Sequence, residues 1–191
     1  APTAPPWPWL AMRASQAALV GQMLRKGLNS PVTTSCGRLF DAVAAELGLC
    51  QAIDYEGQAA ILLEHVQDLS ESRPYACPVD LTTSPARLDT LALFAQVAAD
   101  ARRGVSAAQI SRRFHLGLVQ GLAALTQAMA KEFGIHRVAL SGGVLQNRTL
   151  ARRLPVVLRE LGLIPLTHRQ VPANDGCISL GQVTYGRLAV K

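Results

Sequence analysis

The sequence contains few charged side chains and few cysteines, and each shortage excludes a class of protein. Charged residues make up 17% of the 191 residues and hydrophobic residues 49%. An intrinsically disordered chain is therefore excluded, because such chains combine low hydrophobicity with dense charge. The four cysteines have no CxxC spacing, which argues against a zinc knuckle or a thioredoxin-type redox pair. Sparse, scattered cysteines are typical of buried free thiols in a reducing compartment.

Long apolar runs are missing as well. The longest uncharged apolar stretch covers 116–130 and is interrupted by Gln120, Thr126 and Gln127. A bilayer requires about 20 consecutive apolar residues, so no membrane span is expected. No basic start followed by an apolar run marks a signal peptide. We therefore expect a cytoplasmic protein with no membrane partner.

The charge balance is modestly basic. Nineteen Lys and Arg residues against 13 Asp and Glu give a formal charge of +6, and the isoelectric point is about 9.6. This balance permits a partner that carries phosphate, such as a nucleotide or a nucleic acid. A charge of this size is equally ordinary for solubility. The length predicts one domain or two small ones.

The chain reads as a proline-rich start followed by a helix-rich body. Residues 1–8 are expected to be a linker or a cut end. Hydrophobic spacing of four, four, four, three and four residues, from Ile110 to Met129, predicts a helix buried along one side. The segment 70–86 is expected to be irregular, with one strand near 75–79. Helices are predicted over 9–26, 38–47, 57–67, 88–103, 106–133, 148–161 and 177–188.

The carboxy-terminal third changes character. A short apolar strand is predicted at 137–140, followed by the glycine-containing loop 141–147 and a helix. A second strand near 164–166 leads into the loop 167–176 and a last helix. Strands that alternate with helices in this way are typical of an α/β layer. The sequence therefore predicts a helix-rich α/β fold.

Two segments offer chemistry, and each has a plainer alternative. The pair Gly142-Gly143 after a strand lets a ligand approach the backbone, at a helix start that can bind phosphate. Asn147 adds a donor and an acceptor for a ribose or a purine, although a simple tight turn explains the glycines as well. Asp175 is either a metal ligand or the N-cap of the last helix.

Three other residues each have two possible interpretations. Asp41 either accepts hydrogen bonds from a ribose or is an acid favoured by the dipole of its helix. Gly57 either allows close backbone approach or closes a loop. His115 lies between two apolar residues, and we expect a hydrogen-bonded packing residue rather than a ligand. The four histidines have no spacing typical of a helical metal pair.

The segment 104–117 resembles the entry of a helix-turn-helix, with Arg112 and Arg113 as phosphate contacts. A recognition helix would continue with polar or basic residues. The residues 118–130 are apolar and uncharged instead, so no DNA partner is expected.

Taken together, five segments resemble one family in their order along the chain. They are NSPVTTSCGRLFDAVAAELGL (29–49), YEGQAAILLE (55–64), FH (114–115), SGGVLQN (141–147) and VPANDGCISLGQ (171–182). This ordered set resembles the carboxy-terminal part of the hydrogenase maturation carbamoyltransferase family, HypF. The resemblance covers about residues 9–188, so 9–191 is expected to be one carboxy-terminal lobe.

The resemblance implies a fold and an activity. The fold is the second lobe of an actin/hexokinase/Hsp70-type (ASKHA) nucleotide-binding domain, similar to the threonylcarbamoyl-transferases that modify tRNA. The full-length family uses carbamoyl phosphate and ATP to make carbamoyl-adenylate. It then transfers the carbamoyl group to the carboxy-terminal Cys of HypE, for the cyanide ligand of [NiFe]-hydrogenase.

The resemblance also implies roles for residues of this chain. Asp41, Gly57 and Asn147 would contact ATP or carbamoyl-adenylate, Gly142 and Gly143 would line its base or phosphate, and Asp175 would hold a divalent metal, either iron, zinc or magnesium. No catalytic residue is assigned within the chain. An amino-terminal lobe, on the same or a separate chain, would be needed for activity, so the segment alone is expected to be inactive. The alternative is a non-catalytic nucleotide-binding or interaction module.

Overall fold

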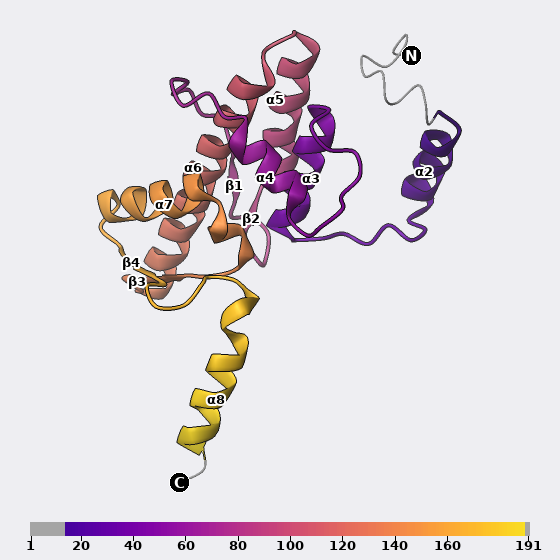
Figure 1. The fold of residues 1–191 in the computed structure, drawn as a ribbon. Coiled ribbons are helices and arrows are strands. Elements are labelled where there is room, and N and C mark those ends of the chain that lie inside the picture. Colours follow the sequence, from indigo (N-terminus) through magenta and orange to yellow (C-terminus); the bar gives the residue numbers. More distant parts are fainter. Residues whose placement is uncertain (1–13, 190–191) are drawn as a thin grey trace.

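The structure, a computed structural model, describes residues 14–189. It consists mainly of helices, with two small two-stranded sheets (Figure 1). The predicted linker at 1–8 and the start of the predicted first helix lie outside the described residues. The helices are α2 (Ala14–Lys26), α3 (Cys36–Glu46), α4 (Gln58–His65), α5 (Thr90–Arg102), α6 (Ala107–Phe133), α7 (Arg148–Glu160) and α8 (Ile178–Ala189). The strands are β1 (Val79–Asp80), β2 (Arg87–Leu88), β3 (Arg137–Leu140) and β4 (Ile164–Thr167).

The long helix α6 is the centre of the fold, and α5 and α7 both pack against it. Its boundaries follow from local signals. The hydroxyl of Ser106 accepts a hydrogen bond from the backbone N–H of Gln109 at 3.3 Å, which satisfies one of the free donors of the first turn. Gly134 ends the helix with a φ of 64°, a conformation that suits glycine. The predicted helix is confirmed.

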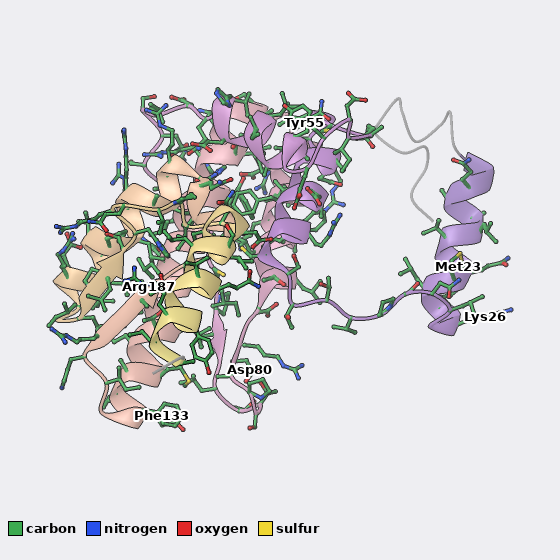
Figure 2. All side chains as sticks on the ribbon, turned by 60° about the horizontal axis from the view of Figure 1, so that its bottom comes forward. Met23, Lys26, Tyr55, Asp80, Phe133 and Arg187 are labelled. Carbon is green, nitrogen blue, oxygen red and sulfur yellow. The ribbon has the colours of Figure 1, made fainter. Side chains whose placement is uncertain are left out.

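The apolar stripe of α6 is buried in its first half. Ile110, Phe114 and Leu118 are at most 1% exposed, whereas Leu122 is partly buried. Phe133 at the end of the helix is 65% exposed, and Figure 2 shows it at the margin of the molecule. The stripe predicted from the spacing thus packs against other elements of the described chain mainly in its first half.

Helices α3 and α4 close the core on the side of the amino-terminal half of α6. Phe40, Val43 and Leu63 are almost fully buried, and the ring of Phe40 meets that of Phe114 edge-on, with centroids 5.2 Å apart. Such edge-to-face pairs add to the stabilisation from burial. This core fixes where α3 lies relative to α6.

One strand prediction is wrong. The strand expected near 75–79 begins only at Val79 and pairs antiparallel with β2, which was not predicted. The backbone N–H of Tyr75 instead donates to the carbonyl of Arg113 on α6, at 3.1 Å. The helix expected from 88 begins at Thr90, because Asp89 caps it by accepting a hydrogen bond from the N–H of Ala92 at 2.8 Å.

The carboxy-terminal third confirms the predicted α/β alternation. Strands β3 and β4 are parallel, with Arg137 opposite Ile164 and Leu140 opposite Thr167. The intervening α7 buries Leu150 and Leu158 completely, which is the usual way a crossover helix covers a parallel pair. Short 3-10 helices follow each strand, at Gly143–Gln146 (η1) and Asp175–Cys177 (η2).

The first and last described helices stand apart from this body. In Figure 1, α8 extends away from the two sheets, and both figures show α2 separated from the other helices. No residue of α8 is buried, and its apolar side chains Ile178, Val183 and Tyr185 are 53%, 62% and 74% exposed. Between residues 14 and 189, no helix combines the length and the hydropathy needed to cross a bilayer.

Candidate functional site

The glycine loop lies where the sequence predicts it, between β3 and α7. The backbone N–H of Gly142 donates to the carbonyl of Ala173 at 2.7 Å, so this loop lies against the segment that precedes η2. Gly142 has a φ of 105°, which favours glycine. At Gly143 an added Cβ would meet no atom within 4 Å. The loop therefore presents open backbone on its Gly143 side.

Asn147 is engaged within the chain. Its Oδ1 accepts a hydrogen bond from the N–H of Leu150 at 3.1 Å, which caps α7, and its Nδ2 donates to Nε2 of His115 at 3.0 Å. Asn147 is 8% exposed. The side chain expected to contact a ribose or a purine thus holds the start of α7 in place.

His115 is a buried, hydrogen-bonded packing residue, as predicted. Its Nδ1 donates to the carbonyl of Ser111 at 2.7 Å, and the rings of Phe40 and Phe114 pack edge-on against it. Burial lowers its pKa to about 4, partly offset by the bond to Ser111. The imidazole is therefore neutral at physiological pH, and Nε2 remains an acceptor for Asn147.

Asp41 lies on α3 and is partly exposed. One of its oxygens accepts a hydrogen bond from the guanidinium of Arg38 at 3.0 Å. The preceding residue, Phe40, has its ring centroid 5.3 Å from that of His115. His115 of α6 therefore contacts both α3, through Phe40, and the start of α7, through Asn147. Asp41 follows Phe40 in α3, so it is connected to the glycine loop by these buried contacts.

Gly57 serves as the N-cap of α4. Its φ of 80° lies in the left-handed region, and its carbonyl accepts from the N–H of Ile61 at 2.9 Å. These bonds belong to α4, so loop closure accounts for this glycine, and a role in binding remains a prediction.

Asp175 is exposed at the start of η2. The cap there is Asn174, whose Oδ1 accepts from the N–H of Gly176 at 3.2 Å, so the alternative of Asp175 as N-cap is wrong. Within residues 14–189 no three His, Cys, Asp or Glu side chains gather into a metal-binding group. A single carboxylate does not hold a divalent metal on its own. A metal bound by Asp175 would therefore need further ligands from outside the described residues, and the role of Asp175 as a metal ligand remains a prediction.

A cavity of about 500 Å³ opens beside the glycine loop. It lies at the carboxyl ends of the parallel strands, the edge at which α/β sheets generally bind ligands. Three of its side chains, Arg152, Arg159 and His168, carry nitrogen donors suited to phosphate. The other lining residues are Leu140, Leu145, Gln146, Ala151, Pro155, Thr167, Val171, Pro172 and Ala173.

The cavity is adjacent to the predicted site but does not coincide with it. None of the six predicted site residues lines it, although Leu145 and Gln146 of the glycine loop do, together with Leu140, which precedes the loop. Sequence reasoning missed Arg152 and Arg159. Their seven-residue spacing places both on one face of the helix after the glycine loop, a signal that was available. A volume of this size suits a small organic ligand.

The two arginines considered for DNA contacts point into the molecule. Arg112 is 5% exposed, and the guanidinium of Arg113 forms ion pairs with Glu71 and Asp100, both at 2.7 Å. Neither is arranged to contact a phosphate backbone in a groove.

Comparisons with known proteins assign this chain to a family. Residues 4–182 match the family described as "Carbamoyltransferase, Kae1-like Domain, second subdomain". Carbamoyltransferase HypF2 of Cupriavidus necator is 36% identical over 197 residues, covering 90% of this chain and 24% of the relative. Carbamoyltransferase HypF of Rhizobium leguminosarum bv. viciae is 40% identical over 169 residues, covering 88% and 21%.

Solved structures agree. The crystal structure of full-length HypF in the phosphate- and nucleotide-bound form superposes with a TM-score of 0.83 at 34% identity, over 93% of this chain and 23% of that one. The structure of HypF from T. kodakarensis gives a TM-score of 0.77 at 29% identity, over 92% and 22%. The helix-rich α/β fold is thus one found within carbamoyltransferases. The chain belongs to the HypF family, as the second subdomain of its Kae1-like domain, and spans about a quarter of the length of these relatives.

Proposed function

We propose that this chain forms one wall of the carbamoyl-transfer site of a HypF-type enzyme and holds the nucleotide part of carbamoyl-adenylate. The observation that carries the proposal is the match over 93% of the chain to a HypF crystallised with nucleotide. In fold terms, the chain would be the second lobe of an ASKHA domain. ATP or carbamoyl-adenylate would be its ligand.

The geometry beside the glycine loop supports this role. The open backbone at Gly143 allows close approach of a flat base or a phosphate. Arg152 and Arg159 line the neighbouring cavity and can neutralise the phosphate of an adenylate through charge-assisted hydrogen bonds. Asn147 positions the start of α7, while Asp41 lies on α3 and Gly57 caps the start of α4.

The chemical step would be acyl transfer. The thiolate of the carboxy-terminal Cys of HypE attacks the carbamoyl carbon, a C–S bond forms, and the bond to the adenylate oxygen breaks. AMP leaves with the electron pair, and the thiol proton passes to solvent. Cationic groups held near the phosphate stabilise the charge that develops on the leaving group. The chain would also limit the access of water to the adenylate.

The rest of the site would come from the remainder of a HypF protein. The apolar side chains of α8 lack a covering element among the described residues, and exposed apolar faces of this kind mark interaction surfaces. We infer that α8 packs against the amino-terminal lobe of a HypF-type domain, on the same or a separate chain. That lobe would also supply partners for Asp175 in holding a metal, and use of carbamoyl phosphate would belong to the full protein.

A reconstitution assay tests this proposal. The chain is mixed with a full-length HypF relative from which the matching segment has been deleted, together with ATP, carbamoyl phosphate and HypE. Mass spectrometry of the carboxy-terminal Cys of HypE reports transfer. The proposal expects transfer by the mixture and none by either component alone. Nucleotide binding without transfer by the mixture would favour the non-catalytic module instead.

A further inference from the structure

A second cavity, which the proposed function does not use, lies between α4, α6 and α7. Its volume is about 450 Å³. Four of its lining residues are arginines, and one is a carboxylate, Glu64. The full lining is Glu64, His65, Gln67, Leu69, Arg112, Arg148, Thr149, Arg152 and Arg153.

The cavity is strongly cationic. Four arginines and one glutamate give 4 − 1 = +3 when His65 is neutral. Glu64 is already engaged, because its Oε1 accepts from the backbone N–H of Arg148 at 2.9 Å. The residues that line the cavity therefore do not neutralise its positive charge.

Arg112 is the unusual member of this set. It is 5% exposed, yet its guanidinium bonds neutral acceptors, Oε1 of Gln67 at 3.2 Å and the carbonyl of Glu71 at 3.4 Å. In the part of the chain that the structure describes, it forms no ion pair. Burial and the charge of Arg153 lower its pKa, and the charge of Asp68 offsets this in part without forming an ion pair. A buried charge that lacks a direct ion-pair partner is costly.

The neighbouring Arg113, on the same helix, has its charge neutralised by carboxylates. It pairs with both Glu71 and Asp100 at 2.7 Å. Gln67, by contrast, holds Arg112 in a fixed place, because its Oε1 also accepts from the hydroxyl of Thr149 on α7 at 3.1 Å. One wall of the cavity thus carries a buried cation that hydrogen bonds hold in place.

We propose that this cavity binds a phosphate-type dianion, either free phosphate or a phosphate monoester. Guanidinium groups match the geometry and charge of phosphate oxygens. Arg112 would supply the buried contact, and Arg148, Arg152 and Arg153 the rim. Arg152 also lines the cavity at the strand ends, so the two sites lie on either side of this residue.

The test is calorimetric titration of the 191-residue chain with inorganic phosphate at low ionic strength. Saturable binding is expected, and Arg153→Ala, which removes a rim charge, weakens it by about threefold to tenfold. Glu64→Gln keeps an acceptor for the N–H of Arg148 and removes the one negative charge, so it tightens binding. This gain of affinity is not an effect that damage to the fold produces. Arg187→Ala on α8 removes the same charge elsewhere and leaves the affinity unchanged.

Further measurements locate the ligand and its source. Arg159→Ala alters the other cavity alone, so an equal loss there would place the phosphate in that cavity and overturn the proposal. Absence of binding by the wild-type chain, or equal effects of Arg153→Ala and Arg187→Ala, would also overturn it. Titration with glycerol phosphate separates the sources: tighter binding than inorganic phosphate indicates a monoester, and weaker binding indicates the free ion.

Discussion

The side-chain amide of Asn147 donates a hydrogen bond to Nε2 of His115 at 3.0 Å, while its oxygen caps α7. One side chain therefore joins the amino-terminal half of α6 to the end of the glycine loop. Because Nδ1 of His115 donates to the carbonyl of Ser111, Nε2 is left as an acceptor. The protonation state of one buried imidazole thus controls the contact that holds the candidate nucleotide-binding loop.

This contact makes stability depend on pH. The pKa of His115 is lowered by burial from 6.5 to about 4, so the unfolded chain binds more protons between these values. The free energy of unfolding should therefore fall as the pH is lowered from 6.5 towards 4, by up to about 3 kcal/mol. Urea denaturation at pH 7, 6 and 5 measures the slope.

The matched control is His168→Gln, which removes an exposed histidine and should keep this slope. His115→Gln, whose side-chain oxygen can still accept from Asn147, should lower stability at pH 7 and flatten the slope between pH 5 and 6.5. An unchanged slope in His115→Gln would contradict the assignment.

A buried ionic network ties α5 to α6. Asp100 accepts hydrogen bonds from the hydroxyl of Tyr75 at 2.6 Å and from Arg113 at 2.7 Å, and it also pairs with Arg103. Burial raises the pKa of Asp100, but these bonds outweigh burial and leave it below its usual value. Asp100→Asn should lower the free energy of unfolding by about 3 kcal/mol, because Arg113 loses a buried partner.

Chemical denaturation at pH 7 measures this loss, with the exposed Glu132→Gln as the control. The stability that Asp100 contributes is present above its unfolded pKa and is lost as the pH falls through the folded pKa. The difference between Asp100→Asn and the wild type should therefore shrink in strong acid. A difference that grows in acid would refute the ionic account.

A close approach of backbone to helix explains why α6 has a glycine at position 117. A Cβ at Gly117 would overlap the carbonyl of Tyr75, where the segment before β1 crosses the helix. Gly117→Ala should destabilise the chain by about 1–3 kcal/mol through overpacking, although alanine favours helix. Gly181→Ala on α8, where a Cβ meets nothing within 4 Å, should be neutral or stabilising. Equal thermal melting of both variants would contradict this packing.

The exposed face of α8 should matter for assembly and not for the stability of the chain. Val183→Asp places a charge on a side chain that is 62% exposed, so the free energy of unfolding should change by no more than about 0.5 kcal/mol. Association with the deleted HypF relative described above should be lost, whereas Gln182→Asp, which adds the same charge one residue away, should retain it. Size-exclusion chromatography reports both outcomes, and association that survives Val183→Asp would contradict the role of α8.

Local signals in the sequence predicted the helices and the parallel strands. The cap at Ser106 and the alternation after Arg137 each act within a few residues, so they can be identified without tertiary structure. Pairing of β1 with β2 depends instead on two-residue strands that have no periodicity of their own. The strand expected at Tyr75 is displaced by a backbone bond to Arg113 on α6.

The sequence predicted which segments form the candidate site, but it did not predict the contacts that their side chains make. The glycine loop lies between β3 and α7 as the sequence predicts, whereas its hydrogen bond to Ala173 was not predicted. The partner of Asn147 is His115, 32 residues away, and nothing in the local sequence indicates that the amide is already engaged. The same holds for Arg112, whose lack of an ion pair among the described residues emerges only from the packing of α4 against α6 and α7.

The most direct test of the central claim is an AMP titration of the wild-type chain and of Gly143→Val. The added side chain meets no atom of the described chain within 4 Å of its Cβ, so folding is preserved while the open backbone is covered. Gly181→Val on α8 is the matched control. The account predicts saturable binding that Gly143→Val weakens by about tenfold or more and Gly181→Val leaves unchanged. Equal AMP affinity in all three proteins would contradict a nucleotide held at the glycine loop.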